Sequence, residues 1–359
     1  MTKAILEIKN LEFSFRTYGG VVKAVRDVSF EVREGEILGI VGESGCGKSV
    51  TVQCILRLNP EPPGFFENGS IMYKGEDIIK KSNREMRKIR GVEIGFIFQD
   101  PMTSLNPTMR IGKQIEEIFV GRSKVSRSEA KQKALDILEL VGINEPERRY
   151  RQYPHELSGG MKQRVMIAIA LVGQPGIIIA DEPTTSLDVT IEAQILEILK
   201  DLQERFNTSI ILITHDLGVI AKMCDRVLVM YGGKIIEEGP VNNIFYEAAH
   251  PYTSGLIQSI ATLDTTKDQK LVPIDGTPPD LFSPPVGCPF AARCEYAMEI
   301  CYQSMPDHTQ VKDEHYSSCW LLHEYAPDVQ LPAVERTEVF GEEEKNIDAV
   351  DAMEGKNER

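Results

Sequence analysis

The chain has 359 residues, of which 42% are hydrophobic and 26% charged, and its formal net charge is −14. This composition is ordinary for a globular protein, and the acidic balance excludes a broad basic surface for nucleic acid, so no nucleic-acid partner is expected. No apolar run reaches the roughly 18 residues that a membrane-spanning helix needs. The start of the chain also lacks the pattern of a signal peptide. We therefore expect a cytosolic protein whose membrane role depends on partners.

Patterns in the first part of the chain predict strands. Residues 11–15 and 28–32 alternate apolar and polar side chains, which is typical of half-buried antiparallel strands. Residues 37–41, 177–180 and 210–213 are apolar throughout, which suits parallel strands buried on both faces. Between the last two, apolar residues recur at helical spacing over 191–206. Strand, helix and strand in this order form a βαβ unit, so the core is predicted to be an α/β sheet.

Three regions depart from this core pattern. More than 130 residues separate the first two buried strands, and we expect a mostly helical subdomain inserted there, at about residues 101–165, within a main domain of residues 1–260. Proline and glycine become frequent after His250, which predicts a C-terminal extension over residues 261–325. Residues 326–359 carry ten carboxylates against four basic residues and are expected to be a disordered tail.

A glycine-rich segment directly follows the first buried strand. It matches the phosphate-loop pattern, and with the next residue it gives the predicted nucleotide contacts Gly42, Glu43, Ser44, Gly45, Cys46, Gly47, Lys48, Ser49 and Val50. Glycines let successive backbone N–H groups approach a phosphate at the start of a helix. Lys48 is expected to neutralise the β- and γ-phosphates, and the Ser49 hydroxyl to ligate Mg²⁺. The alternative is a chance glycine-rich turn, and the segment alone predicts only binding of ATP or GTP.

The second buried strand ends in Asp181-Glu182. At that position Asp181 is suited to hold the Mg²⁺ shell, and Glu182 to polarise the attacking water as a general base. An Asp-Glu pair after a strand is commonly only a solvated strand end. Its combination with the phosphate loop favours nucleotide hydrolysis.

The segment Leu157-Ser158-Gly159-Gly160-Met161-Lys162-Gln163 decides the class, because it resembles the signature sequence of ABC ATPases. Ser158 and the bare amides up to Gly160 offer a second anion site at a helix start, although a simple helix cap would look similar. The resemblance implies a P-loop NTPase fold of the ABC type, with an antiparallel β subdomain, an inserted helical subdomain and a C-terminal Cys-rich extension. It also implies a head-to-tail dimer with a second ABC ATPase subunit.

Further positions match family motifs. Gln99, in Phe96-Ile97-Phe98-Gln99-Asp100, resembles the Q-loop glutamine that contacts Mg²⁺ or water and senses the membrane subunits. Ser186-Leu187-Asp188 resembles the D-loop at the dimer seam, and His215 resembles the switch histidine that contacts the γ-phosphate. The family also stacks an aromatic ring on adenine. Phe15 and Tyr18 are both candidates for that contact, and either could instead belong to the core.

Four stretches resemble the dipeptide and oligopeptide importer branch of the family: residues 97–107, 153–161, 250–253 and 288–294. This resemblance implies two transmembrane permease subunits, an extracellular solute-binding protein, and a location at the cytoplasmic face of the cell membrane. An importer of nickel or another small solute, a soluble ABC ATPase acting on ribosomes or DNA, and an iron–sulfur redox sensor remain the alternatives.

Four cysteines near the C-terminus, Cys288, Cys294, Cys301 and Cys319, have the spacing C-x5-C-x6-C-x17-C. In a cytosolic chain such a group suggests metal more than disulfides. Four thiolates suit either an iron–sulfur cluster or tetrahedral zinc, and the residues alone leave both open beside free structural thiols. The resemblance implies a 4Fe-4S cluster held by these four residues.

Overall fold

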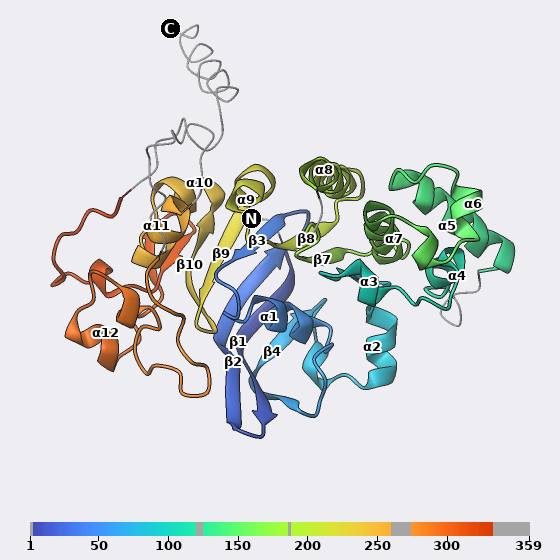
Figure 1. Ribbon diagram of the computed structural model, residues 1–359. Coiled ribbons are helices and arrows are strands. Elements are labelled where there is room, and N and C mark those ends of the chain that lie inside the picture. The colour runs from blue at the N-terminus through green and yellow to red at the C-terminus, as the bar shows by residue number, and fades with distance from the viewer. Residues whose placement is uncertain (1–2, 120–124, 186–187, 260–273, 333–359) are drawn as a thin grey trace, which may run out of the picture.

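The computed structural model describes residues 3–119, 125–185, 188–259 and 274–332. Figure 1 shows its two sheets, with the antiparallel strands in the lower half of the view and most of the helices along its top and right. One sheet has four strands in the order β2-β1-β4-β5 and the other has eight in the order β11-β12-β10-β9-β3-β8-β7-β6. The smaller sheet comprises β1 (Ala4–Thr17), β2 (Gly20–Arg33), β4 (Gly64–Tyr73) and β5 (Glu76–Asp77).

Helices connect most of the strands of the larger sheet along the chain. Its strands are β3 (Ile37–Val41), β6 (Ile94–Ile97), β7 (Ile177–Asp181), β8 (Ser209–Ile213), β9 (Arg226–Tyr231), β10 (Lys234–Pro240), β11 (Thr309–Lys312) and β12 (His315–Ser317). The helices are α1 (Lys48–Ile55), α2 (Asn83–Ile89), α3 (Pro101–Ser104), α4 (Ile111–Glu116), α5 (Arg127–Leu140), α6 (Pro146–Tyr150), α7 (Gly159–Leu171), α8 (Val189–Phe206), α9 (Leu217–Met223), α10 (Val241–Tyr246), α11 (Pro251–Gln258) and α12 (Glu299–Gln303). Within the described residues, no helix combines the length and apolarity needed to cross a membrane.

The predicted antiparallel pair is confirmed. Strands β1 and β2 pair antiparallel along their length, with Phe13 opposite Val25 and Phe15 opposite Val22. Their inward residues share one buried cluster with α1 and with one face of the larger sheet. This cluster fixes the hairpin against the sheet that carries the phosphate loop.

The buried βαβ unit is also confirmed. Strands β3, β7 and β8 pair parallel, and α8 connects β7 to β8. Alternate residues of each strand enter two different clusters: Leu38 and Ile40 face the antiparallel sheet, whereas Ile37 and Val41 face the helices. Burial on both faces explains why these strands are apolar throughout rather than alternating.

Two parallel strands were not predicted: β9, which pairs with β3, and β6. Strand β6 pairs with β7 and carries the sequence Ile-Gly-Phe-Ile, which is short and interrupted by Gly95. A Cβ on Gly95 would collide with the carbonyl oxygen of Ala170 in α7, so glycine is needed where the helix crosses the strand. Helices α3 to α6 and most of α7 follow β6 and form the group on the right of Figure 1.

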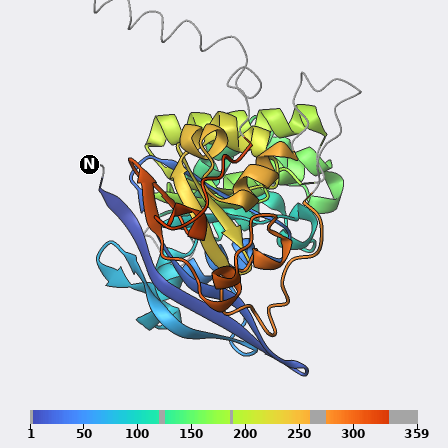
Figure 2. The same ribbon diagram turned by 90° about the vertical axis from the view of Figure 1, so that its left-hand side faces the viewer.

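The C-terminal region is attached to the main sheet rather than separate from it. Strand β12 pairs with β10, so residues 309–317 extend the eight-stranded sheet, and Figure 2 shows this region covering one end of the fold. At the junction the Glu237 carboxylate and the His315 ring are fully buried and bonded at 2.8 Å. Glu237 also accepts the N–H groups of Ala249 and His250. Residues 333–359 of the predicted tail lie outside the described residues.

We expect Glu237→Ala to destabilise the protein by about 3–5 kcal/mol, since it leaves His315 and two backbone donors buried without their acceptor. The matched control is Glu197→Ala on the exposed side of α8, which should change stability by no more than about 0.5 kcal/mol. Urea unfolding measures both variants. Equal unfolding midpoints for the two would contradict the importance of this junction.

Candidate functional site

The phosphate-loop residues lie between β3 and the first turn of α1. The three glycines of this loop are required by their backbone conformation, and two of them also by space. Gly42, Gly45 and Gly47 have φ values of 145°, 78° and 101°, which other residues adopt only with strain. A Cβ on Gly42 would overlap the carbonyl oxygen of Met230, and one on Gly47 that of Ala24. The loop is therefore pressed against β2 and β9 and exposes its outer residues, including Ser44.

Lys48 is buried at the base of the loop. Its Nζ donates to the carbonyl oxygens of Gly42 at 2.7 Å and Glu43 at 3.1 Å. These bonds satisfy two of the three donors of the ammonium group. Cys46 is buried beside it, and burial raises the pKa of that thiol. Val50 lies in the first turn of α1 and packs partly against the core shared with β1.

The two predicted Mg²⁺ ligands of the strand and the loop are in contact. The Ser49 hydroxyl donates to Asp181 Oδ1 at 2.8 Å. Burial raises the pKa of Asp181, and the bond from Ser49 opposes that shift. A buried carboxylate whose pKa is raised by desolvation is stabilised by an added cation, and a hydroxyl with a carboxylate is an oxygen donor set that suits Mg²⁺. The residues therefore fit this metal.

The three predicted catalytic residues converge on one carboxylate. Glu182 Oε2 accepts a hydrogen bond from Gln99 Nε2 at 2.7 Å and lies 3.8 Å from His215 Nδ1. The Thr185 hydroxyl also donates to it, at 2.9 Å. Thr185 was missed by the sequence reasoning, and its position three residues after Glu182 was the only available signal.

The backbone at Glu182 is strained. Its φ is 48°, a left-handed value that is uncommon for residues other than glycine. The Glu182 N–H donates to the carbonyl oxygen of Ile213 in β8, which holds the residue at the strand end. Such conformations cost about 1–3 kcal/mol and concentrate at functional sites. In this conformation the Glu182 side chain is bonded to Gln99.

The predicted signature and D-loop residues cap two helices at the surface. The exposed Ser158 accepts the Met161 N–H at the start of α7. Asp188 accepts the Ile191 N–H at 2.9 Å at the start of α8, and Ile191 packs against Gly160. The two helix starts are thus adjacent and open to solvent. Ser186 and Leu187 of the predicted D-loop lie outside the described residues.

The two adenine candidates differ in exposure. Phe15 is partly buried and packs edge to face on Phe13, with centroids 5.2 Å apart. Tyr18 lies in the turn between β1 and β2 and is fully exposed. Tyr18 is therefore the candidate with both ring faces available, whereas Phe15 mainly completes the hydrophobic core.

The four C-terminal cysteines lie near one another, and all seven cysteines of the chain are free thiols. Burial raises the pKa of Cys288 to about 11 and that of Cys319 to about 12, and the charges of neighbouring cysteines add to both shifts. The Cys288 N–H donates to the Cys301 carbonyl oxygen at 2.8 Å. Over the described residues, no three His, Cys, Asp or Glu side chains are arranged to hold a metal ion. In the part of the chain that the structure describes, these thiols therefore do not converge on the position of a single ion.

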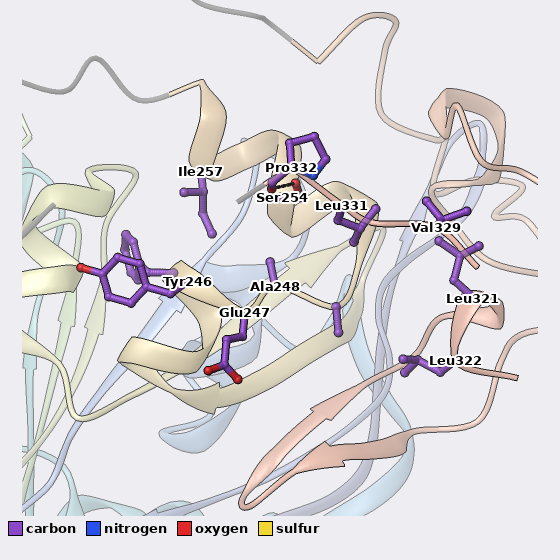
Figure 3. A pocket seen from close by; sticks show the side chains of 12 residues that line it. Tyr246, Glu247, Ala248, Ser254, Ile257, Leu321, Leu322, Val329, Leu331 and Pro332 are labelled. Carbon is purple, nitrogen blue, oxygen red and sulfur yellow. Dashed lines mark hydrogen bonds between the residues drawn. The ribbon is translucent and has the colours of Figure 1, made fainter. Parts of the chain in front are cut away.

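A separate cavity of about 230 Å³ lies between α10, α11 and the last described segment (Figure 3). Its lining is mainly apolar, and the Ser254 hydroxyl donates across it to the Pro332 carbonyl oxygen at 2.7 Å. It contains none of the predicted nucleotide residues. The chemistry described above is located instead at the ends of β3, β7 and β8.

Comparisons with known proteins agree with this geometry. Residues 25–185 match the family model described as ABC transporter, and residues 236–301 match that of the oligopeptide/dipeptide transporter C-terminal region. The chain is 56% identical to the oligopeptide transport ATP-binding protein OppD of Bacillus subtilis, over 91% of this chain and 92% of that one. It is 53% identical to the dipeptide transport ATP-binding protein DppD of the same organism, over 91% and 97%.

A solved structure supports the fold of the main domain. It is that of the dimeric ATP-binding cassette MJ0796 bound to ADP and Pi in a post-hydrolysis state, with 30% identity and a TM-score of 0.59. The match covers 66% of this chain and 98% of that one. Together with the two Bacillus relatives, this likeness shows that the chain belongs to the ABC transporter ATP-binding protein family, among the oligopeptide and dipeptide transport members.

Proposed function

We propose that this chain is the ATP-hydrolysing subunit of an ABC importer of dipeptides or oligopeptides, bound to permease subunits at the cytoplasmic face of the membrane. The observation that carries the hydrolytic role is the convergence of Gln99, Thr185 and His215 on the Glu182 carboxylate. The peptide role is supported by the names of the relatives and by the matching C-terminal region.

Nucleotide binding begins with an exchange of partners at Lys48. Its ammonium leaves the carbonyl oxygens of Gly42 and Glu43 and pairs with the β- and γ-phosphates, which carry more negative charge. Loop N–H groups and the start of α1 complete the phosphate contacts. Ser49, Asp181 and Gln99 would hold Mg²⁺, which neutralises charge on the phosphates during transfer. The exposed ring of Tyr18 is the preferred contact for adenine.

Hydrolysis requires a base beside the γ-phosphate. Glu182 accepts the proton of the attacking water, while the bonds from Gln99 and Thr185 hold its carboxylate in place. His215 is largely exposed and donates a hydrogen bond to the γ-phosphate, in either its neutral or its charged form. At the open start of α7, Ser158 and Gly160 supply a hydroxyl and backbone N–H groups to the nucleotide on a second ATPase subunit. Asp188, at the start of α8, lies at the seam between the two subunits.

We expect Glu182→Gln to lower ATP turnover by about a hundredfold or more while nucleotide binding is retained, because the amide keeps the shape but accepts no proton. Phosphate release and equilibrium binding of MgATP measure the two effects separately. Glu197→Gln on the exposed face of α8 serves as the control and should behave as wild type. Wild-type turnover by Glu182→Gln would remove Glu182 from the role of base.

The transported solute is tested in the assembled transporter. The chain, its partner ATPase and two permeases are reconstituted in liposomes with the extracellular solute-binding protein. We expect ATP turnover to rise when the binding protein carries a dipeptide or oligopeptide, and the peptide to accumulate inside. Stimulation by nickel but not by peptides would replace the peptide assignment with the small-solute alternative.

We further propose that Cys288, Cys294, Cys301 and Cys319 hold a 4Fe-4S cluster. Two observations support this: the Cys288 N–H donates to the Cys301 carbonyl oxygen at 2.8 Å, and burial together with the charges of the other three thiols raises the pKa of Cys319. Each thiolate of such a cluster binds a different iron, so the sulfur atoms need not converge on one ion as they do around zinc. When bound, the cluster supplies a cross-link that orders the loops carrying the four cysteines.

Anaerobically purified protein should contain about four iron and four sulfide per chain and show a broad visible absorption. Cys319→Ser should lose most of both, whereas Cys54→Ala, which removes a buried thiol of α1, should retain them. Stoichiometric zinc without sulfide would replace the cluster with a zinc site. Absence of any metal from the protein would leave the four residues as structural thiols.

A further inference from the structure

Two residues of the segment that matches the transporter C-terminal family model (residues 236–301, here called the C-terminal region) contact the phosphate loop, and both contacts are made to Glu43. The Glu43 carboxylate accepts a hydrogen bond from Arg293 Nη1 at 2.7 Å. The Glu43 N–H donates to the Tyr252 hydroxyl at 2.8 Å. These partners come from residues 250–253 and 288–294, two of the stretches that set this branch of the family apart. Neither stretch has a role in the hydrolytic mechanism above.

Arg293 is built into the region around it. Its side chain is only 6% exposed, and its Nε and Nη2 donate to the carbonyl oxygens of Asp275 and Ile274, each at 2.8 Å. Nη1 also donates to the Tyr231 hydroxyl at 2.9 Å. The planar guanidinium therefore donates to the extension through Nε and Nη2, and to Glu43 and β9 through Nη1. A lysine could not reproduce this arrangement.

Tyr252 is equally fixed. It is fully buried, and its ring lies 4.5 Å from that of Tyr231 and 5.3 Å from that of Phe290, measured between centroids. Because each ring packs against the other two, the hydroxyl of Tyr252 has little freedom to move. The Tyr252 hydroxyl is therefore a fixed acceptor for the Glu43 N–H.

Charge gives this contact a direct consequence for the nucleotide. Glu43 places a carboxylate inside the loop that receives the triphosphate, and like charges at this range disfavour binding. Arg293 neutralises that carboxylate within a largely buried ion pair. Without Arg293, the phosphates would meet a loop that is both more negative and less well anchored.

We propose that Arg293 is a positioning residue for nucleotide binding: acting through Glu43, and together with Tyr252, it lets the C-terminal region set the affinity of the phosphate loop for MgATP. This rests on the proposed ATPase function. The extension also reaches the neighbouring hairpin, where Arg26 Nη2 donates to the Pro285 carbonyl oxygen at 2.7 Å. The extension thus contacts both strands that lie beside the phosphate loop, β2 through Arg26 and β9 through Tyr231.

The test is a mutant cycle read by equilibrium binding of a non-hydrolysable MgATP analogue to the full chain. Arg293→Ala should weaken binding by roughly ten- to a hundredfold, with turnover at saturating ATP much less affected. Glu43→Gln should bind at least as tightly as wild type, because it removes the like charge. The double variant Arg293→Ala/Glu43→Gln should recover most of the lost affinity, which a merely structural role of Arg293 would not allow.

Tyr252→Phe provides an independent measurement that does not depend on the folding of the Arg293 variants. It keeps the ring packing and removes only the acceptor of the Glu43 N–H. We expect a several-fold loss of affinity, with the fold retained and the melting temperature lowered by only a few degrees. Wild-type affinity in Arg293→Ala or in Tyr252→Phe would overturn the inference, as would a double variant as weak as Arg293→Ala. A wild-type protein that fails to bind MgATP would instead overturn the proposed function itself.

Discussion

The burial of strands β3, β7 and β8 on both faces is the constraint on which the site depends. Because these strands run parallel, their carboxyl ends meet at one edge of the sheet. The phosphate loop follows β3, the Asp181–Glu182 pair ends β7, and His215 comes just after β8. Residues far apart in sequence are therefore brought to one edge by the sheet alone, before any side-chain contact is made.

That edge is costly to maintain, and the costs are concentrated where nucleotide chemistry needs them. Glu182 has a left-handed backbone, and Asp181 is desolvated. The rigid sheet can hold both residues in these environments, because the Glu182 N–H donates to β8 and the Ser49 hydroxyl donates to Asp181. A less buried strand end would relax both residues and would separate the base from Gln99.

Sequence patterns predicted the parts of the fold that follow from local periodicity. The β1–β2 pair and the βαβ unit were of this kind, since burial on one or two faces leaves a direct mark on the order of apolar residues. Strand β6 was missed because its apolar pattern is only four residues long and is interrupted by Gly95. A glycine is needed there because α7 crosses the strand at that point. The phosphate loop and the Asp181–Glu182 pair were found from their residue types after buried strands, and the other site motifs by resemblance. No pattern distinguished Tyr18 from Phe15, because exposure at that hairpin depends on tertiary packing. Nor do the spacings of the four cysteines specify what they bind.

The contact between Glu43 and Arg293 was beyond sequence reasoning for a different reason. The two residues are 250 positions apart, and each belongs to a motif that was interpreted separately. The packing of Tyr231, Tyr252 and Phe290 brings those motifs together beneath the loop. A carboxylate in a phosphate-binding loop disfavours its own ligand unless a cation is held beside it, and the main domain leaves that cation to the C-terminal region. On this view the extension is part of the nucleotide site, and the affinity of the loop depends on residues far beyond the ATPase motifs.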